Sequence, residues 1–346
     1  YIFNFMKNFL IITGGAGYIG SHTILEILAN KNWEIISIDN FLNSHAYVFN
    51  RIENISGKKI KNYNVDICDL ENLKSTFKEI GKIDGVIHFA ALKAVGESVE
   101  KPLWYYNNNI GGLINILECC KEFNVSNFIF SSSCSIYGNV EKLPVDELTP
   151  LAKAESPYAS TKAMGEEIIE SFVKVNSTKC TCLRYFNPVG AHKSGLNGES
   201  PINKPNNLVP VITQFASNII DEMFVYGDDY NTRDGSCIRD YIHVTDIASA
   251  HIKALEYSTN KTPPFLEFIN LGTGNGVSVL EAINAFENIS GIKLNYKIGD
   301  RRKGDVENIY SDSRKAKKLL NWIPKYKIEG MMNSAWKWQQ NLNNNK

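Results

Sequence analysis

The chain has no excess of charge of either sign, since its 346 residues include 37 Lys and Arg against 37 Asp and Glu. A balanced chain creates no long-range field that would attract nucleic acid or an anionic membrane. We therefore expect neither as a partner, and we expect any anionic ligand to be held by a few local groups.

The patterns of metal and disulfide chemistry are missing too. The seven cysteines include no Cys-x-x-Cys pair, and the six histidines form neither His-x-His nor His-Glu-x-x-His. An odd number of scattered cysteines is typical of reduced, packed thiols in a cytosolic protein. The sequence thus predicts a cytoplasmic protein without a metal site.

Long apolar runs are absent as well, and none approaches the roughly 18 residues of a membrane-spanning helix. The apolar opening YIFNFMKNFLIITGG lacks the basic leading region and the small-residue cleavage site of a signal peptide. Residues 1–5 precede Met6, so whether they are native is left open.

Short apolar runs alternate with amphipathic segments in the first half of the chain. This pattern predicts parallel strands joined by helices, and hence a doubly wound, Rossmann-type α/β sheet with its ligands at the carboxyl ends of the strands. The expected strands are residues 9–13, 34–38, 61–64, 85–89, 127–131 and 180–185, and the expected helices are residues 18–30, 69–80, 103–122 and 158–175.

The texture of the chain changes after Asn187. The stretch PVGAHKSGLNGESPINKPNN is rich in Gly, Pro and Asn, which argues against regular structure. We expect residues 1–186 to form the first domain and residues 187–346 mainly a second, smaller mixed α/β domain. A helix at 245–257 and a strand at 267–271, within the stretch 240–275, are expected to rejoin the main sheet.

A glycine-rich turn follows the first expected strand. In FLIITGGAGYIGSH, Gly14, Gly17 and Gly20 stand between a strand and a helix, where they allow a tight turn and a close approach of backbone to a pyrophosphate. Asp39 ends the second strand, where a carboxylate accepts hydrogen bonds from ribose hydroxyls and repels a 2′-phosphate. These two features predict NAD rather than NADP. Asp66 and Ile67 after the third strand, and HFAALK after the fourth, are the expected places for further cofactor contacts.

The segment SPYASTK places Tyr158 and Lys162 four residues apart, so both side chains project from one face of a helix. The same spacing recurs by chance at Tyr257 and Lys261, where no serine partner follows. Tyr158 differs because FIFSSSCSIYG puts Ser133 at the end of the preceding strand. We interpret Tyr158, Lys162 and Ser133 as the catalytic residues.

The expected role of Lys162 is electrostatic. A phenol with an ordinary pKa of about 10 is a poor base at neutral pH. One positive charge about 4 Å away contributes about 4 kcal/mol at an effective dielectric of about 20, which corresponds to as much as three pKa units. With Lys162 and an oxidised nicotinamide nearby, we expect the phenol to act as a base near pH 7.

Taken together, these blocks resemble the UDP-galactose 4-epimerases (UDP-glucose 4-epimerases) of the extended short-chain dehydrogenase/reductase superfamily. The matching blocks cover almost the whole chain and appear in the family's order: TGGAGYIGSH, HFAALKAVGESVEKPLWYYNNN, FIFSSS, SPYASTK, RYFNPVGAH, NNLVP, RDYIHVTD and RRKGD.

The resemblance implies an isomerase with tightly bound NAD that interconverts UDP-galactose and UDP-glucose. Tyr158 would take the proton of the sugar 4-hydroxyl while the C4 hydride moves to the cofactor, and the resulting 4-ketose would turn its other face before the hydride returns. The family also implies a homodimer, for which the helices at 103–122 and 158–175 are candidate interfaces.

The resemblance also implies the ligand contacts. The expected cofactor site comprises Gly14, Gly17, Tyr18, Ile19, Gly20, Asp39, Asn40, Phe41, Asn43, Ser44, Asp66, Ile67, Phe89, Ala90, Ala91, Lys93, Asn108, Ser131, Tyr158, Lys162, Tyr185 and Phe186. The expected UDP-sugar site comprises Lys93, Ser133, Ser135, Tyr158, Phe186, Asn187, Asn207, Leu208, Phe224, Tyr226, Arg239, Tyr241, Arg302, Asp305 and Ile309. Arg239 and Arg302 offer guanidinium forks for a diphosphate, and Tyr226 an aromatic face for uracil.

Two positions depart from the family pattern. SSSCSIYG stands where SSSATVYG is common, so Cys134 replaces Ala while Ser135 keeps a hydroxyl. Ile309 occupies a position where some members have Tyr, which excludes N-acetylated sugars, and others have Cys, which admits them. Acceptance of UDP-N-acetyl sugars is left open.

Other readings remain. A nucleotide-sugar 4,6-dehydratase would use the same fold, Tyr and Lys, but it needs an acid and a base where this chain has Cys134 and Ser135. A related decarboxylase shares the fold as well. A non-catalytic NAD-sensing module would commonly lack the Tyr and Lys pair.

Overall fold

A computed structural model describes residues 8–31, 33–203, 205–302 and 305–344. The strands are β1 (Asn8–Thr13), β2 (Trp33–Ile38), β3 (Lys61–Tyr63), β4 (Gly85–His88), β5 (Asn127–Ser133), β6 (Lys179–Tyr185), β7 (Asn187–Val189), β8 (Phe224–Tyr226), β9 (Ile238–His243), β10 (Leu266–Leu271), β11 (Gly276–Ser278), β12 (Lys297–Gly299) and β13 (Asn308–Ile309). Residues 1–5, whose origin the sequence left open, lie outside the described part.

The α-helices are α1 (Tyr18–Asn30), α2 (Val48–Ser56), α3 (Leu70–Ile80), α4 (Val95–Glu100), α5 (Pro102–Tyr106), α6 (Gly112–Glu122), α7 (Pro157–Val173), α8 (Leu208–Ala216), α9 (Val244–Thr259), α10 (Val279–Ser290), α11 (Arg314–Leu320) and α12 (Ile328–Asn344). A π-helical turn, η1 (Asn107–Gly111), joins α5 to α6, and a 3₁₀ turn, η2 (Cys134–Tyr137), follows β5.

The centre of the molecule is a seven-stranded parallel sheet with the order β10-β6-β5-β4-β1-β2-β3. The order reverses beside β1, which is the topological switch point where doubly wound folds bind their ligands. The predicted Rossmann-type α/β class is confirmed. The strand expected at 267–271 does rejoin this sheet, as β10 beside β6.

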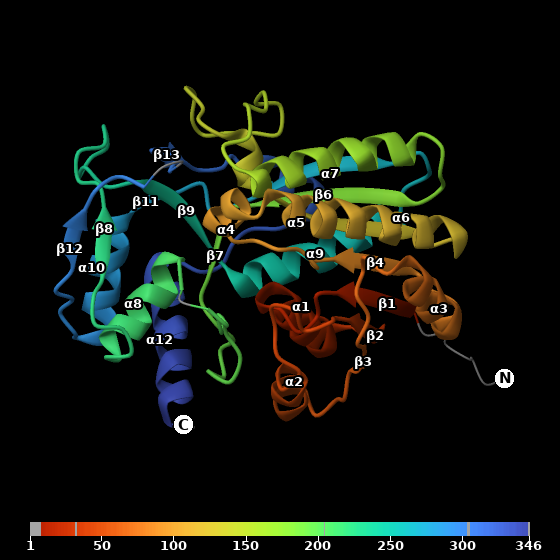
Figure 1. The fold of residues 1–346 in the computed structure, drawn as a ribbon, viewed down its shortest axis with the longest axis horizontal. Helices are drawn as coiled ribbons and strands as arrows, with labels where there is room; N and C mark the ends of the chain where they lie inside the picture. The colour runs from red at the N-terminus through yellow and green to blue at the C-terminus, as the bar shows by residue number, and fades with distance from the viewer. Residues whose placement is uncertain (1–7, 32, 204, 303–304, 345–346) are drawn as a thin grey trace.

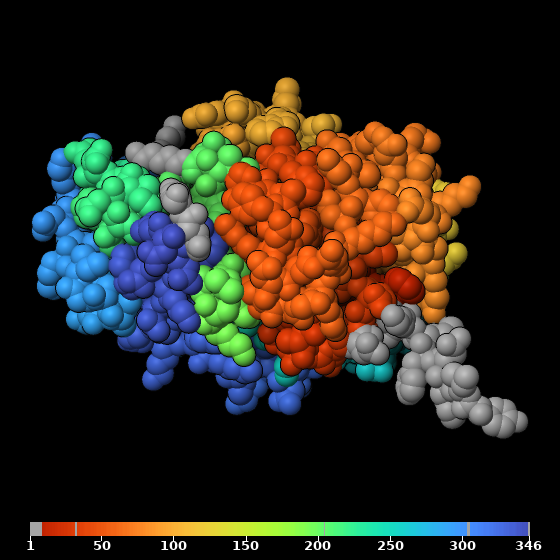
Figure 2. Space-filling model, turned by 90° about the horizontal axis from the view of Figure 1, so that it is seen from below, coloured from red at the N-terminus to blue at the C-terminus, as the bar shows by residue number. Residues whose placement is uncertain are grey.

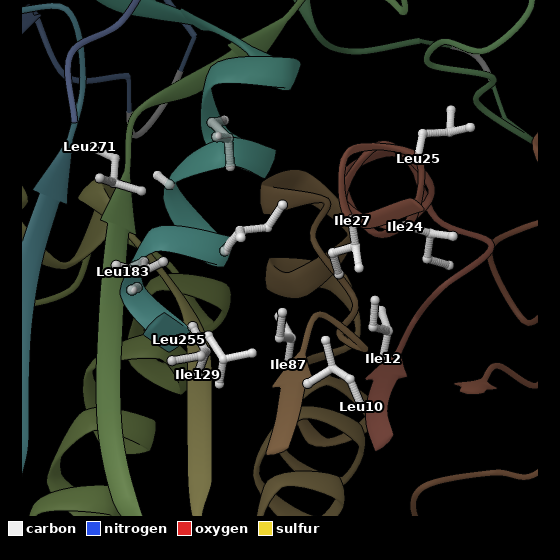
Figure 3. Packing of buried hydrophobic residues seen from close by; sticks show 14 of the residues in the cluster. Leu10, Ile12, Ile24, Leu25, Ile27, Ile87, Ile129, Leu183, Leu255 and Leu271 are labelled. Atoms are coloured by element: carbon white, nitrogen blue, oxygen red, sulfur yellow. The ribbon is translucent and has the colours of Figure 1, made fainter. Parts of the chain in front are cut away.

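Helices cover both faces of this sheet (Figure 1). On one face, α1 and α9 pack their apolar sides on the strands and α2 packs against α1, and Figure 3 shows Ile24 and Ile27 of α1 turned toward Leu10 and Ile12 of β1. On the other face, α3, α6 and α7 cover a second cluster that includes Phe77, Phe128 and Phe130. Strands buried on both faces explain their nearly continuous apolar sequences.

A smaller α/β part, drawn at the left of Figure 1, contains α8, α10, α12 and two short sheets. In one sheet β9 pairs with β7, β11 and β13; in the other β8 pairs with β12. Its own core gathers Met223, Phe286 and Met331. The second, smaller domain that the sequence predicted is therefore present.

One predicted element is wrong in detail. The helix expected over residues 103–122 is interrupted, because the backbone widens to π-helical hydrogen bonding at Asn107–Gly111 between α5 and α6. Such π-turns occur often at functional sites, and the candidate cofactor residue Asn108 lies inside this one.

None of the helices in the described part is both long and apolar enough to cross a membrane.

Candidate active site

Most candidate cofactor residues lie near the carboxyl ends of the parallel strands, as the fold class predicts. They follow β1 (Gly14, Gly17, and Tyr18, Ile19 and Gly20 at the start of α1), β2 (Asp39, Asn40, Phe41, Asn43, Ser44), β3 (Asp66, Ile67), β4 (Phe89, Ala90, Ala91, Lys93) and β6 (Phe186), or they lie in β5 (Ser131) and at the end of β6 (Tyr185). Asn108 in the π-turn and Tyr158 and Lys162 in α7 complete the set.

The glycine-rich turn has no room for side chains. A Cβ on Gly14 would lie 2.8 Å from the Ala90 nitrogen, and a Cβ on Gly20 would lie 2.2 Å from the Gly14 oxygen. Gly14 also needs a positive φ of 72°. No side chain caps the start of α1 and no acidic residue lies in its first turn. The cradle therefore fits an anionic pyrophosphate at the positive end of the helix.

Asp39 organises the loop beside this turn. Its carboxylate accepts hydrogen bonds from the Ala16 nitrogen (2.9 Å), the Phe41 nitrogen (2.9 Å) and the Ser44 hydroxyl (2.8 Å). A carboxylate offers about four acceptor positions, so these bonds leave one for a ribose hydroxyl. The arrangement fits the adenosine ribose of NAD.

Asn109, which the sequence analysis missed, holds the loop after β4. Its side chain accepts from the Leu92 nitrogen (2.8 Å) and donates to the Leu92 oxygen (3.0 Å) and to the Thr161 hydroxyl (3.1 Å). Asn108 bonds the same side chain at 2.9 Å. The π-turn thereby ties the β4 loop to α7, and only its run of three asparagines could have signalled this role.

The three candidate catalytic residues come together where β5 ends beside α7. Ser156 caps α7 by accepting from the Ala159 nitrogen, which sets the start of the helix. Tyr158 is half-buried and hydrogen-bonds the buried Ser133 hydroxyl. Lys162, one turn further along, donates to the Ser131 carbonyl at 2.7 Å.

The protein's own groups alone do not lower the pKa of Tyr158 toward 7, so the expected base still depends on the nicotinamide charge. Burial raises the pKa of Tyr158 to about 12, and the hydrogen bond with Ser133, which lowers it, offsets only part of this. The Lys162 ammonium lies 6.0 Å from the phenol ring centre and is directed at Ser131. Burial also lowers the pKa of Lys162 to about 8, against the opposing charge of Glu166.

The second Tyr and Lys pair of the sequence is a structural contact. Lys261 lies over the Tyr257 ring at 4.1 Å, and that ring packs against Phe265 just before β10 begins. The amino end of a strand is the edge opposite to the candidate site, so geometry separates two motifs that spacing could not.

The arginines of the candidate nucleotide site converge on Asp305. Arg302 donates to both Asp305 oxygens at 2.9 and 3.3 Å, and Arg239 approaches the same carboxylate at 3.7 Å. The Arg302 guanidinium lies 5.0 Å from the Tyr226 ring, which is stacked near Phe224. Two cations beside exposed aromatic faces suit a diphosphate next to a base.

The remaining candidate sugar residues come from several elements of both parts of the fold. Asn187 of β7 and Tyr241 of β9 are register partners, and Asn207 and Leu208 begin α8. Phe186 and Ile309 share a small buried cluster with Ile136 and Tyr137. The Ser135 hydroxyl is buried and has no hydrogen-bond partner within the described residues, as expected of a group that bonds a ligand.

Sequence reasoning also missed a buried ion pair beneath the catalytic residues. Arg184 of β6 binds Glu166 of α7 through two hydrogen bonds of 2.9 and 2.7 Å, and the Ser132 hydroxyl donates to the same carboxylate at 2.6 Å. Arg184 also donates to the Tyr137 hydroxyl at 3.0 Å. A Glu eight residues after Tyr158 was visible in the sequence, but its partner follows only from the sheet order.

Comparison with known proteins agrees with this geometry. The protein-family model described as GDP-mannose 4,6 dehydratase matches residues 11–335. A UDP-glucose 4-epimerase of Pasteurella multocida is 46% identical over 332 residues, which cover 96% of this chain and 97% of that one. A UDP-glucose 4-epimerase of Drosophila melanogaster is 46% identical, with coverages of 96% and 97%.

Two solved structures are also similar to this chain in fold and in sequence. A UDP-glucose-4-epimerase from Stenotrophomonas maltophila with bound NAD and formylated UDP-arabinopyranose has a TM-score of 0.94 at 40% identity, covering 98% of this chain and all of that one. A Bifidobacterium longum UDP-glucose 4-epimerase in complex with NAD+ and UDP has a TM-score of 0.93 at 43% identity, with coverages of 98% and 100%. This chain therefore belongs to the UDP-glucose 4-epimerase family of extended short-chain dehydrogenases/reductases.

Proposed function

We propose that this chain interconverts UDP-galactose and UDP-glucose by inverting C4 of the sugar, with NAD held throughout the cycle. The observation that carries this proposal is the position of the Tyr158 phenol. It hydrogen-bonds Ser133 at the sheet edge that also carries the glycine cradle, and the arginine pair near Asp305 supplies an anchor for the nucleotide.

The proposed roles of the residues in this reaction are as follows. When bound, NAD supplies a reversible hydride acceptor for C4 and, in its oxidised form, a positive charge beside the phenol. Tyr158 takes the proton of the 4-hydroxyl and returns it to the 4-ketose, while Ser133 orients the phenol. Lys162 adds positive charge from one helical turn away. Arg239, Arg302 and Tyr226 hold UDP while the sugar presents its other face.

We assign each ligand to one part of the fold. We assign NAD to residues 1–186 together with the returning part of 240–275, and the UDP-sugar mainly to residues 187–346. The support is that the glycine cradle and Asp39 follow strands of the large sheet, whereas Arg239 lies on β9, Tyr226 on β8 and Arg302 in the segment before β13.

We also propose that the protein is a cytoplasmic homodimer. The apolar side chains of Ile114 in α6 and Val175 just after α7 line one groove and are 43 and 81% exposed, and such an exposed apolar patch favours a protein partner. Its cysteines are free, and most are buried, as suits a reducing compartment. Light scattering that gives the mass of a single chain would contradict the dimer.

Product analysis tests the proposed reaction. UDP-galactose incubated with the protein, without added NAD, should yield UDP-glucose on chromatography until both sugars reach equilibrium. A lasting 4-keto-6-deoxy product would instead identify a 4,6-dehydratase, which Cys134 and Ser135 argue against. Absence of any product from protein shown to contain NAD would favour a sensing module.

Retention of the cofactor is a separate expectation. Because the hydride must return to the same sugar, protein purified without added cofactor should release close to one NAD per chain on denaturation. Chains that are free of NAD and yet active without any addition would contradict this mechanism.

A further inference from the structure

The segment between β7 and α8 fills the seam between the two parts of the molecule. Figure 2 shows this segment, in green, between the amino-terminal part in orange and α12 in blue. Asn197 donates to the Ser21 hydroxyl of α1 at 3.0 Å, and the Asn341 side chain of α12 donates to the Gly195 carbonyl at 2.8 Å. The segment therefore contacts both sides directly.

Glu199, a charged residue of this segment, contacts two residues of the candidate ligand sites. One of its oxygens, Oε1, accepts from the Lys93 ammonium at 2.9 Å and from the Asn207 side-chain amide at 3.1 Å. The Glu199 side chain is only 11% exposed. Lys93 follows β4 of the large sheet, whereas Asn207 immediately precedes α8 in the smaller α/β part. A single carboxylate oxygen thus joins one candidate ligand group from each side.

The backbone of Glu199 is fixed independently of these contacts. The Trp338 indole of α12 donates to the Glu199 carbonyl at 2.9 Å. The preceding residue, Gly198, lies so close to the indole that a Cβ there would be 2.5 Å from ring atoms. The carboxylate therefore projects from an anchored point, which is what a group that sets the position of others requires.

We propose that Glu199 is a positioning residue that fixes Lys93 and Asn207 relative to each other. It would thereby set the distance between the sugar of the bound UDP-sugar and the cofactor. The proposal rests on the proposed function and adds to it a residue that contacts neither reacting atom. Its charge is needed because one neutral amide oxygen binds an ammonium much more weakly than a carboxylate does.

The test compares Glu199→Gln with Glu287→Gln in the NAD-containing protein. Glu287 is a matched control in α10: its side chain is 9% exposed, and it accepts from the Lys293 ammonium (2.5 Å) and the Leu294 nitrogen (2.8 Å), away from the candidate site. Because small misplacements cost large factors in rate, we expect E199Q to lower kcat for UDP-galactose by about tenfold or more. NAD content and melting temperature should stay near those of the unmodified protein, and E287Q should leave kcat unchanged.

A double-variant comparison does not depend on E199Q folding well. Lys93→Met and Asn207→Ala each break the bridge through Glu199, so the double variant should lose less activity than the product of the two single losses. Losses that simply multiply would overturn the proposal, and so would an E199Q protein whose kcat lies within about twofold of the original. An unmodified protein without epimerase activity would refute the proposed function itself, before any variant is made.

Discussion

At the scale of single residues, the proposed chemistry depends on one phenol whose surroundings oppose its ionisation. Burial raises the pKa of Tyr158 to about 12, so the protein's own groups leave the phenol protonated at neutral pH. The proposed mechanism therefore requires the positive charge of oxidised NAD in addition to that of Lys162.

Replacing this phenol should abolish turnover without unfolding the chain. Tyr158→Phe removes the proton acceptor, and loss of a general base typically costs 10²- to 10⁴-fold in rate, so we expect kcat to fall by about that factor. Tyr257→Phe is the matched control, because Tyr257 has the same spacing to a lysine but packs against Phe265. Equal activities of the two variants would show that another base operates.

Ile309 is the residue at which we expect substrate breadth to be set. It is 4% exposed and packs with Ile136, Tyr137 and Phe186 beside the catalytic group. A tyrosine here adds a ring to a packed cluster, so Ile309→Tyr should lower turnover of UDP-N-acetylgalactosamine relative to UDP-galactose by about tenfold or more.

The relevant measurement is the ratio of kcat/KM for the two sugars in the original and the variant. Ile309→Val, which shortens the side chain, should not lower this ratio. A ratio that stays constant in I309Y would place the discrimination elsewhere.

At the scale of elements, α7 carries two of the proposed catalytic residues and a buried ion-pair residue along one face. Tyr158, Lys162 and Glu166 follow each other at four-residue spacing, so they lie one above another. Glu166 forms the buried ion pair with Arg184. The Glu166 side chain is 4% exposed and the Arg184 side chain is 6% exposed. The pair joins the helix to β6 and, through Ser132, to β5, which holds the phenol against Ser133.

Breaking this buried pair should destabilise the whole fold. Arg184→Met leaves the Glu166 charge without its partner, and we expect the free energy of unfolding to fall by about 3–5 kcal/mol in urea titrations. The double variant E166M/R184M removes both charges and should recover much of this loss. For comparison, Glu170→Gln in the exposed Lys174 pair of the same helix should cost less than about 1 kcal/mol. A small effect of R184M would show that the pair is dispensable.

At the scale of the whole molecule, four buried histidines govern behaviour in mild acid. Burial lowers the pKa of His22 and His251 to about 4 and that of His88 and His243 to about 3. They lie in α1, in α9 and at the ends of β4 and β9. The folded state thus keeps these rings neutral at pH values where the unfolded chain takes up protons.

The stability should therefore fall as the pH drops below about 6.5, the ordinary histidine pKa. Each ring contributes up to about 1.4 kcal/mol per pH unit between 6.5 and its folded value, because only the unfolded state binds the proton there. Unfolding in urea at pH 7.0, 6.0 and 5.5 measures this slope above the ordinary carboxyl pKa values of about 4. A free energy of unfolding that is constant over this range would contradict the assigned burial.

The sequence by itself determined much of the fold and indicated the candidate cofactor site. Local signals carry that information: the helix over residues 18–30 ends where it was expected, and Gly14, Gly20 and Asp39 are identifiable because a tight turn and a strand-end carboxylate need those residue types. The carboxyl end of β5 and the break between α5 and α6 were not predicted from the sequence, because they depend on packing rather than on periodicity.

Only the tertiary structure decided which distant groups meet. The partners of Glu199 and Glu166 and the burial of the Ser135 hydroxyl follow from strand order and from the packing between the two parts of the molecule. The tertiary structure also decided that the pKa of Tyr158 is raised rather than lowered. Burial of the phenol outweighs the effect of the Lys162 charge, which lies 6.0 Å from the ring centre. Spacing along a chain records which groups share a helix face or a turn, whereas solvent exclusion and long-range pairing exist only once the chain has folded.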